Sequence, residues 1–568
     1  RDTMSRHRFW VVVAGLALVA AGVAARAVQI MVIQHQMWEQ RARRQHERVI
    51  SVPGPRGNIV SADGYVLATS VDRLAVQLDT QLLSYPDLFV GAAAPLLGVP
   101  ERELRTRVET GPRVMWLVQR AERATAEAIR SLAPDAVVLV PDAERIYPMG
   151  ALAAPVVGFV GREELQTIGR AGFEHHYDAV LGGEPESYLA VNDAVQRRIR
   201  LQRTRAGHPG YDLELTLRAR LQAVCEAELR RALIEQRARG ASAVVMETHT
   251  GTVLALASLP SFDPASPGSV PPGNWRLRPV QDAYEPGSLV KPIVAAAALT
   301  ADVVRPGERF DCRNRGARVA GRWIRDHADP GLYSLDEIVV ASANAGIIQV
   351  GERIPPQALW RSFDAFGFGH RTGVGYPAET RGILAPPKEW SKLSRASLAL
   401  GQELTASPLQ VAVAYAAIAN GGWLMQPRLV SRVIGQQESL NTGQRYRSRV
   451  LDEALCQRLC RMLEDVVSTG TGEQAKLAGF RVAGKTGTAQ RAVNGTFDDE
   501  HHIAWFAGFL PHSGPSIVIV VAIEDPRTDF WGSTVAAPVF ARIAEAAVCE
   551  LGLAPESGEG DATVGGLT

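Results

Sequence analysis

The stretch Glu285-Pro286-Gly287-Ser288-Leu289-Val290-Lys291-Pro292 places a serine three residues before a lysine, where a turn gives way to an apolar run. Because proline is tolerated only in the first turn of a helix, the helix is predicted to begin close to Ser288. A spacing of three residues puts Ser288 and Lys291 on one helical face. A hydroxyl with an adjacent amine is the pattern of an activated nucleophile and its base.

Lysine is rare in this chain, and its positions are informative. Only five of the 61 basic residues are Lys, and Lys291 and Lys485 are two of them. A guanidinium keeps its proton in proteins whereas a buried ammonium can lose it, so lysine is kept where protons are transferred. For Lys291 to act as a base, its pKa must fall from about 10.4 to near 7 or 8, a change of roughly 4 kcal/mol. An ammonium of Lys485 about 5 Å away would supply about 3.3 kcal/mol. We therefore expect Lys485 to be the main cause, with partial burial supplying the remainder.

Two further motifs extend the candidate site. Lys485-Thr486-Gly487-Thr488 lies in a strand-like stretch, residues 481–490, in which Thr486 and Thr488 share one face. Their hydroxyls are predicted to hold a carboxylate, while Gly487 lets a substrate backbone lie against the strand. Ser342-Ala343-Asn344 alone would suit a cap or a surface turn. Its position between the other two motifs favours a role at the site.

In this order, Ser288-x-x-Lys291, Ser342-x-Asn344 and Lys485-Thr486-Gly487-Thr488 resemble the signature of penicillin-binding proteins and serine β-lactamases. Much of the rest of the chain resembles class B penicillin-binding proteins, through residues 55–59 (PRGNI), 145–148 (RIYP), 172–174 (GFE), 215–217 (LTL), 405–410 (TASPLQ) and 535–540 (VAAPVF). Asp282 and Glu285 resemble the division-specific subgroup more than the elongation subgroup. The chain departs from the usual family sequence at Leu289, where Thr is common, and at Ala343, where Ser is common. Neither change removes a reacting group.

The resemblance implies a peptidoglycan D,D-transpeptidase. Ser288 would attack the penultimate D-Ala carbonyl of a stem peptide and release the terminal D-Ala, while Lys291 takes the serine proton. The backbone amides of Ser288 and Thr488 would form the oxyanion hole. An amine from a neighbouring peptidoglycan strand would then resolve the acyl-enzyme and leave a crosslink, without a metal or a cofactor.

The other site residues receive their roles from the same resemblance. Ser342 and Lys485 would relay a proton to the leaving amine, and Asn344 would hold the substrate amide. Thr486 and Thr488 would grip the substrate carboxylate.

Two other functional classes are weighed against this interpretation. A hydrolase of the class A β-lactamase type needs a Glu with an Asn four residues later, but Glu389 is followed at that distance by Leu393. D,D-carboxypeptidases are the other hydrolase of this family. A non-catalytic β-lactam-binding scaffold or sensor would keep the fold, but it need not keep every polar group of the site, and this chain keeps them all.

The fold implied is α+β, with an antiparallel sheet flanked by helices in the penicillin-binding and serine β-lactamase manner. Residues 241–247 and 252–258 are predicted to form one hairpin, and residues 504–510 and 516–523 a second strand pair. Helices are predicted at residues 409–419 and 535–551. Further towards the N-terminus, the pattern predicts a hairpin at residues 58–61 and 65–70 and helices at residues 101–107 and 120–132.

The N-terminal region contains a long apolar segment. Residues 9–25 carry no charge and are followed by Arg26 and a further apolar run to Ile33. This length can cross a bilayer if Arg26 snorkels, whereas the core of a cleaved signal peptide, the rival interpretation, is usually shorter. The predicted organisation is therefore a cytoplasmic tail at 1–8, an anchor at 9–33, a dimerisation-type pedestal at 45–230, a transpeptidase domain at 235–552 and a disordered tail at 553–568.

Composition excludes several classes. The net charge of +1 gives no basis for nucleic-acid binding, and the five Cys contain no C-x-x-C pair for zinc. The acidic and histidine-rich residues 498–502 are predicted to be a solvated loop and not a metal site. By resemblance, the partners are stem peptides, β-lactams, a SEDS-type glycosyltransferase and other divisome or elongasome membrane proteins. The protein is expected in the bacterial inner (cytoplasmic) membrane, single-pass, with its catalytic domain periplasmic.

Overall fold

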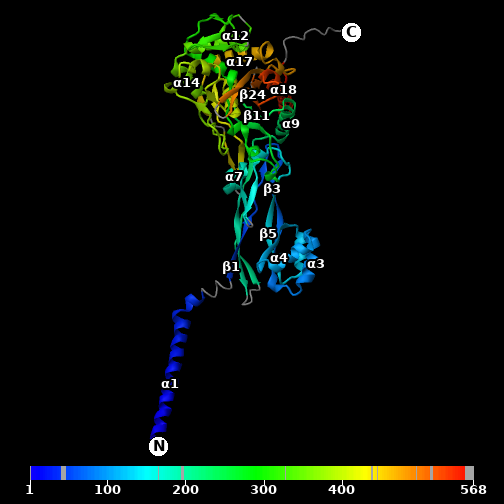
Figure 1. Ribbon diagram of the computed structural model, residues 1–568, viewed down its shortest axis with the longest axis vertical. Helices are drawn as coiled ribbons and strands as arrows, with labels where there is room; N and C mark the ends of the chain where they lie inside the picture. The colour runs from blue at the N-terminus through cyan, green and yellow to red at the C-terminus, as the bar shows by residue number, and fades with distance from the viewer. Residues whose placement is uncertain are drawn as a thin grey trace.

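The computed structural model describes residues 2–556 apart from residues 40–46, 164–165, 193–197, 327, 330, 436–438, 444–445, 494–495, 512–513 and 515. A long N-terminal helix, a slender β-rich region and a globular domain follow one another along an elongated molecule (Figure 1). Helix α1 (Asp2–Val28) continues into a π-helical turn, Gln29–Ile33. The segment His7–Ile33 is long and apolar enough to cross a membrane, as predicted for residues 9–33.

The slender region is built on two sheets. The first has the order β1-β8-β9 and is antiparallel throughout. The second has the order β21-β20-β10-β2-β3-β4, with β5 pairing along β3. The strands are β1 (Glu47–Gly54), β2 (Ile59–Val60), β3 (Val66–Asp79), β4 (Val114–Ala121), β5 (Val137–Ile146), β8 (Gly183–Asn192), β9 (Arg198–Arg205), β10 (Asp212–Leu215), β20 (Val430–Ile434) and β21 (Ser439–Asn441).

The local predictions for this region hold with one correction. β2 and β3 form the predicted hairpin around Gly64, whose φ of +84° suits the turn. Helix α4 (Glu101–Thr110) confirms the helix predicted from residue 101. Helix α5 begins only at Arg123 and ends at Leu132, because β4 extends to Ala121. The expected start at residue 120 was therefore wrong. Helices α3 (Pro86–Leu97), α4 and α5 cover one end of β3, β4 and β5 in a small separate core.

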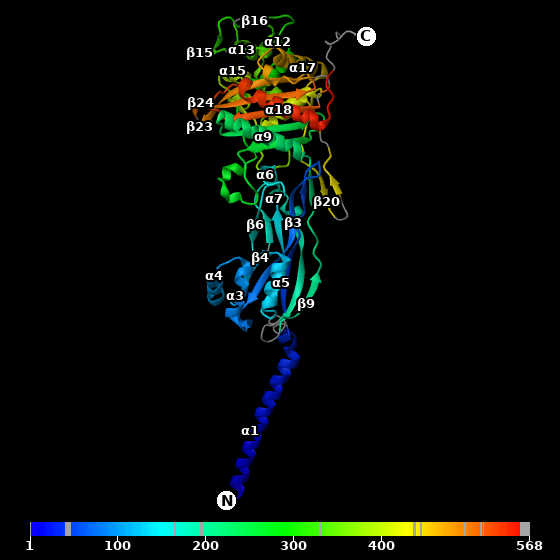
Figure 2. The same cartoon turned by 90° about the vertical axis from the view of Figure 1, so that its right-hand side faces the viewer.

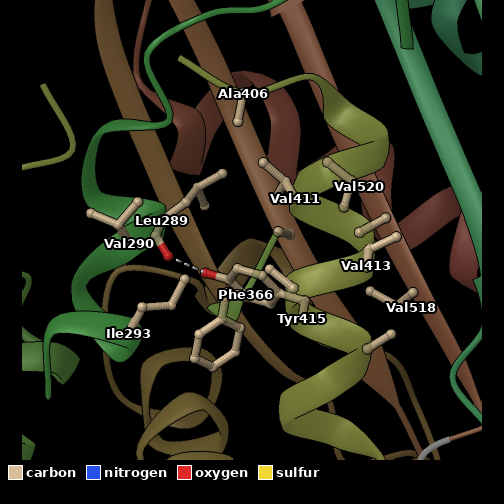
Figure 3. Close-up of a cluster of buried hydrophobic side chains, with 14 of the residues drawn as sticks. Leu289, Val290, Ile293, Phe366, Ala406, Val411, Val413, Tyr415, Val518 and Val520 are labelled. Carbon is tan, nitrogen blue, oxygen red and sulfur yellow. Dashed lines mark hydrogen bonds between the residues drawn. The ribbon is translucent and has the colours of Figure 1, made fainter. Parts of the chain in front are cut away.

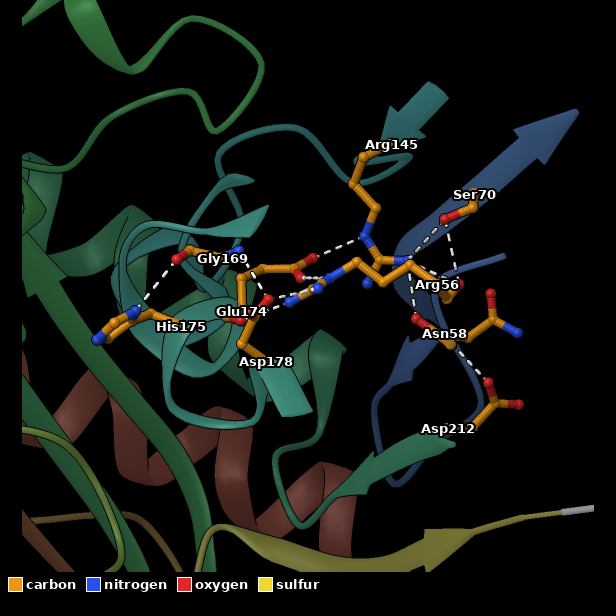
Figure 4. Close-up of polar contacts among 10 residues, drawn as sticks. Arg56, Asn58, Ser70, Arg145, Gly169, Glu174, His175, Asp178 and Asp212 are labelled. Atoms are coloured by element: carbon orange, nitrogen blue, oxygen red, sulfur yellow. Dashed lines mark hydrogen bonds and ion pairs between the residues drawn. The ribbon is translucent and has the colours of Figure 1, made fainter. Parts of the chain in front are cut away.

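A buried ionic network joins three distant segments of the slender region (Figure 4). Glu174 accepts from Arg56 Nε at 2.5 Å and from Arg145 Nε at 2.7 Å, and all three side chains are almost completely buried. Arg56 also donates to Asp178 at 2.6 Å. Truncating one partner of such a buried network costs about 3–5 kcal/mol, because an unpaired charge remains inside. The network holds this region together just below the globular domain, against which Phe173 contacts Tyr376.

The globular domain is organised on a five-stranded antiparallel sheet with the order β12-β11-β25-β24-β23. Both predicted strand pairs are confirmed, since β11 pairs with β12 and β24 with β25. The β11–β25 pairing joins the two hairpins. The bounds are β11 (Gly240–Glu247), β12 (Val253–Leu259), β23 (Ala483–Val493), β24 (Thr496–Leu510) and β25 (Ile517–Glu524).

Helices cover both faces of this sheet, which confirms the predicted antiparallel sheet flanked by helices. Helices α9 (Ala219–Gln236) and α18 (Gly532–Leu551) pack together on one face (Figure 2). The opposite face carries a larger core around α11 (Lys291–Thr300) and α16 (Pro408–Ala419). Further helices on this side are α10 (Arg278–Gln281), α12 (Leu335–Val340), α13 (Asn344–Arg353), α14 (Pro356–Ala365), α15 (Ser394–Ala399) and α17 (Glu453–Ser468).

Two predictions for the second half of the chain concern residues 498–502 and the C-terminal tail. Residues 498–502, expected in a solvated loop, lie in strand β24, because the β23–β24 pair extends as a long hairpin. That expectation was wrong. Residues 557–568 of the expected disordered tail lie outside the described residues.

Candidate active site

The turn that carries the predicted nucleophile, residues 285–290 and named the nucleophile turn, packs against the core. Ser288 lies in the 3₁₀ turn Gly287–Val290, which leads directly into α11, so the helix begins where proline spacing predicted. Leu289 and Val290 are buried, and the Tyr415 hydroxyl on α16 donates to Leu289 O at 2.9 Å (Figure 3). A buried hydroxyl that lost this partner would be left unsatisfied, so the bond fixes the turn against α16.

Strand β23 passes directly against the nucleophile turn. A Cβ on Gly487 would lie 2.9 Å from both Leu289 Cγ and Pro286 O. A Cβ on Gly287, whose φ is +55°, would lie 2.9 Å from Thr488 O. Glycine is therefore required at both positions for the two segments to approach. This packing gives Gly487 a structural reason beyond the substrate contact expected from the sequence, which stays a prediction.

The loop between α12 and α13 brings the second motif to Lys291. Lys291 Nζ donates to Ser342 O at 2.6 Å, to Asn344 Oδ1 at 2.8 Å and to Ser342 Oγ at 3.1 Å. Ser342 adopts a φ of +57°, an uncommon and strained conformation for a residue with a side chain. The strained residue, Ser342, is therefore one of those that hold Lys291 in place. These three acceptors match the three N–H donors of the fully buried ammonium, and none of them is a carboxylate.

Burial is the main cause of the unusual acidity of Lys291. Removal from water lowers its pKa to about 7, opposed by attraction to the Asp326 carboxylate, which raises it. The expectation that repulsion from Lys485 would be the main cause was therefore wrong. The partial charges of backbone and amide oxygens solvate the ammonium less well than water, so desolvation alone brings the pKa to the value that a general base needs.

Lys485 occupies a second dry position on β23. It is fully buried, and its pKa is lowered well below the ordinary value, first by burial and then by repulsion from Lys291. Its Nζ makes longer hydrogen bonds to Thr486 O at 3.3 Å and to the Thr486 and Thr471 hydroxyls, both at 3.4 Å. Repulsion from Lys291 thus adds to burial in lowering the pKa of Lys485.

The threonines after Lys485 are already engaged by the protein. Thr486 Oγ1 lies 2.9 Å from Thr471 Oγ1, in the turn that follows α17. Thr488 Oγ1 accepts from Gly532 N at 3.1 Å, at the start of α18. Because that bond occupies only one lone pair, the Thr488 hydroxyl still has a proton to donate to a carboxylate.

Asp326 is a member of the site that the sequence did not reveal. It follows β15 (Arg322–Arg325), the second strand of a short hairpin with β14 (Gly316–Val319). Its carboxylate accepts from the backbone N–H of Asn344 at 2.9 Å and of Ala345 at 2.6 Å, and so caps α13 from outside the helix. Asn344 Nδ2 donates to Arg325 O at 3.2 Å, which turns Oδ1 towards Lys291. Asp326 thereby holds the backbone of Asn344, and its charge forms part of the environment of Lys291.

The structure brings together most of the predicted residues, but not every predicted pair. Lys291 meets Ser342 and Asn344, and β23 meets the nucleophile turn. Within the described part of the chain, no hydrogen bond joins Lys291 Nζ to Ser288 Oγ or Lys485 Nζ to Ser342. Such contacts often tighten only when substrate is bound.

Comparison with protein families assigns both halves of the chain. Residues 241–545 match the family described as the penicillin-binding protein transpeptidase domain. Residues 51–215 match the penicillin-binding protein dimerisation domain.

Individual relatives and structures resemble the chain over most of its length. Stage V sporulation protein D of Bacillus subtilis is 32% identical over 517 residues, 89% of this chain and 79% of the relative. Peptidoglycan D,D-transpeptidase FtsI of Escherichia coli is 30% identical over 560 residues, 97% of this chain and 93% of the relative. The crystal structure of penicillin-binding protein 3 from Mycobacterium tuberculosis, complexed with aztreonam, has a TM-score of 0.69 at 25% identity and covers 89% of this chain and 98% of its own. Penicillin-binding protein 2X from Streptococcus thermophilus shares the fold, with a TM-score of 0.77 at 19% identity over 88% of this chain and 80% of its own.

Proposed function

The chain belongs to the class B penicillin-binding proteins, which join a dimerisation domain to a transpeptidase domain, and from this premise we propose which residues carry the reaction. The protein is a serine-type peptidoglycan D,D-transpeptidase of cell-wall synthesis. It acts on peptidoglycan, binds penicillin covalently as its family does, and is anchored in a membrane by its N-terminal helix.

The first half of the reaction is assigned to the pair on the nucleophile turn. Ser288 Oγ attacks the carbonyl carbon of the penultimate D-Ala while its proton passes to neutral Lys291. The N–H groups of Ser288 and Thr488 bind the developing oxyanion, usually a contribution of about 3–4 kcal/mol per donor. The tight contact of Gly487 with this turn supports that placement. The observation that carries the assignment is the dry Lys291, with a pKa of about 7, one helical turn from Ser288.

The second half completes the acyl transfer. The bond to the terminal D-Ala breaks, and its amine receives a proton through Ser342 and Lys485. Asn344 holds the substrate amide. An amine of a neighbouring stem peptide then attacks the Ser288 ester, gives up a proton and forms the new amide, which returns the serine hydroxyl. A β-lactam follows the first half only, because its ring-opened amine stays attached and blocks the acceptor.

Substrate recognition is assigned to the edge of β23. Thr486 and Thr488 hold the terminal carboxylate by their hydroxyls, and Gly487 lets the substrate backbone lie along the strand. These hydroxyls and the N–H groups of the nearby lysines can donate hydrogen bonds to a carboxylate. This edge of β23 is therefore suited to bind an anion.

Product analysis distinguishes transpeptidation from hydrolysis. With polymerised peptidoglycan that carries D-Ala-D-Ala stems, crosslinked stems and one free D-Ala per crosslink are expected. Blocking the acceptor amines by acetylation should abolish the crosslinks. Release of D-Ala that proceeds equally well with blocked amines, and leaves only tetrapeptide stems, would identify a carboxypeptidase instead.

The domain limits and surroundings extend this proposal. The anchor, residues 9–33, leaves residues 1–8 in the cytoplasm, with the pedestal (45–230) and transpeptidase domain (235–552) on the periplasmic side of the bacterial inner membrane. A separate SEDS-type glycosyltransferase supplies the glycan strands. Other divisome membrane proteins are further partners. The resemblance at Asp282 and Glu285 favours a septal role over a side-wall role.

Removal of the anchor should separate chemistry from cellular function. A soluble form that starts at Arg43 is expected to react with penicillin close to the full-length rate, since the reacting side chains all lie in the globular domain. When exported, it should fail to support growth, because it loses confinement near lipid-linked substrate and the transmembrane contact with its partner. Full complementation by the soluble form would contradict this prediction.

A further inference from the structure

The nucleophile turn is joined to a second loop, residues 401–403. The proposed mechanism assigns this loop no role. Gly287 N donates to Gly401 O at 3.1 Å, and Glu403 N donates to Glu285 Oε1 at 3.0 Å. A Cβ on Gly401, whose φ is +78°, would lie 2.0 Å from Gly287 O. The loop therefore lies in direct backbone contact with the turn that carries Ser288.

We propose that the Glu285 carboxylate is a positioning residue for acylation, because it ties the 401–403 loop to the nucleophile turn and so fixes the Ser288 hydroxyl and its oxyanion-hole N–H. The Gly287 bond is between backbone groups, whereas the Glu285 bond is made by a side chain and can be altered by a proton. Glu403 holds a φ of +59°, an uncommon conformation that aims its N–H at Glu285. The proposal rests on the assignment of Ser288 as nucleophile.

Charge makes this tie sensitive to pH. Burial raises the pKa of Glu285 to about 7, the Glu403 N–H opposes this, and repulsion from the Glu403 carboxylate adds to it. Among the described residues, Glu403 is the charged side chain that acts on Glu285. A carboxylate accepts an N–H bond about twice as strongly as a neutral carboxyl group. Protonation therefore loosens the tie in the pH range where Lys291 also takes up a proton.

The acid limb of the acylation profile provides the test. Acylation needs Lys291 neutral and is faster when Glu285 is ionised. In the full-length protein the rate should therefore fall below pH 7 with the slope of one that Lys291 gives and, in addition, by a step of about threefold to tenfold as Glu285 takes up its proton. Glu285→Gln keeps an acceptor oxygen but cannot titrate, so its profile should lack the additional step, with a plateau rate within about threefold of wild type. Glu285→Ala should lose about tenfold on the plateau, which corresponds to one hydrogen bond. The measurement is the second-order rate of labelling by fluorescent penicillin between pH 5 and 9.

A matched variant separates charge from geometry. Glu403→Gln keeps the backbone donor and removes the repulsion, so the pKa of Glu285 should fall and labelling at pH 6 should exceed that of wild type. The proposal is overturned if the profiles of wild type and Glu285→Gln superimpose. It is equally overturned by a folded Glu285→Ala protein with the wild-type plateau. Mass spectrometry of the adduct distinguishes a failure of the proposed function from a failure of this inference. An adduct away from Ser288 would overturn the proposed function, whereas an adduct on Ser288 with the same acid limb in wild type and Glu285→Gln would overturn this inference alone.

Discussion

Ser288→Ala should abolish covalent labelling by penicillin in a protein that melts at the wild-type temperature. Ser288 is the one serine of the chain with a lysine three or four residues after it, and that lysine is buried with a pKa of about 7. Removing the nucleophile of a serine acyl-transfer site typically lowers the rate by about 10⁴-fold or more. Labelling followed by gel fluorescence measures the loss, and digestion with mass spectrometry locates the adduct in the wild-type protein.

Ser342→Ala is the matched control for this result. It removes a hydroxyl of the same site and one acceptor of Lys291 but leaves Ser288 in place. We expect slow labelling that still maps to Ser288. An adduct on any other residue, in either protein, would contradict the assignment of the nucleophile.

Much of the fold could be predicted from the sequence because its signals are local. The Asp63-Gly64 turn, the β11–β12 strands and the apolar spacing of α16 and α18 each lie within about twenty residues. The boundary of α5 was misplaced because strand and helix share the Arg-rich stretch from Arg120, where the φ of +57° marks the change. Residues 498–502 were misassigned because a polar strand of a long hairpin looks like a loop when its pairing partner is unknown.

The reacting groups of the site were also predictable, because short motifs carry them. Their supports were not. Asp326 lies 18 residues before Asn344 and reaches it only through the β14–β15 hairpin. Thr471 meets Thr486 across the end of α17, and Tyr415 reaches Leu289 from α16. Contacts of this kind depend on tertiary packing, so the residues that make them have no recognisable spacing in the sequence. For Thr471, the flanking Gly470 and Gly472 were the one available signal.

The error over Lys485 has the same origin. A pair of lysines in a sequence suggests mutual repulsion, whereas burial is a property of the folded chain. The structure shows that Lys291 is completely enclosed and that three neutral oxygens hold it. The expected behaviour of the two lysines in mutants therefore differs from what repulsion would give.

Lys291→Arg should lower the acylation rate by about 10³-fold, the usual contribution of a general base. Arginine keeps the cation and its donors but does not release a proton, so only the transfer step is lost. Lys291→Met, which fits the apolar surroundings without a charge, should lose a similar factor and guards against misfolding of the bulkier arginine. Stopped-flow measurement with a chromogenic β-lactam gives both rates. Wild-type speed in Lys291→Arg would exclude proton transfer to this residue.

The pH dependence then identifies what tunes the base. Acylation requires neutral Lys291, so the wild-type rate should rise with pH through about 7 and level off above it. Because burial and not Lys485 lowers this pKa, Lys485→Ala should leave the midpoint near 7 and lower only the plateau, where the relay to the leaving group is lost. A midpoint that moved up by two pH units in a folded Lys485→Ala protein would restore repulsion as the cause. Asp326→Asn should move the midpoint down, because a negative charge that favours the ammonium has been removed. An unchanged midpoint in Lys485→Ala together with a lowered midpoint in Asp326→Asn would establish that the fold, by excluding water and placing one carboxylate at a distance, sets the basicity of Lys291.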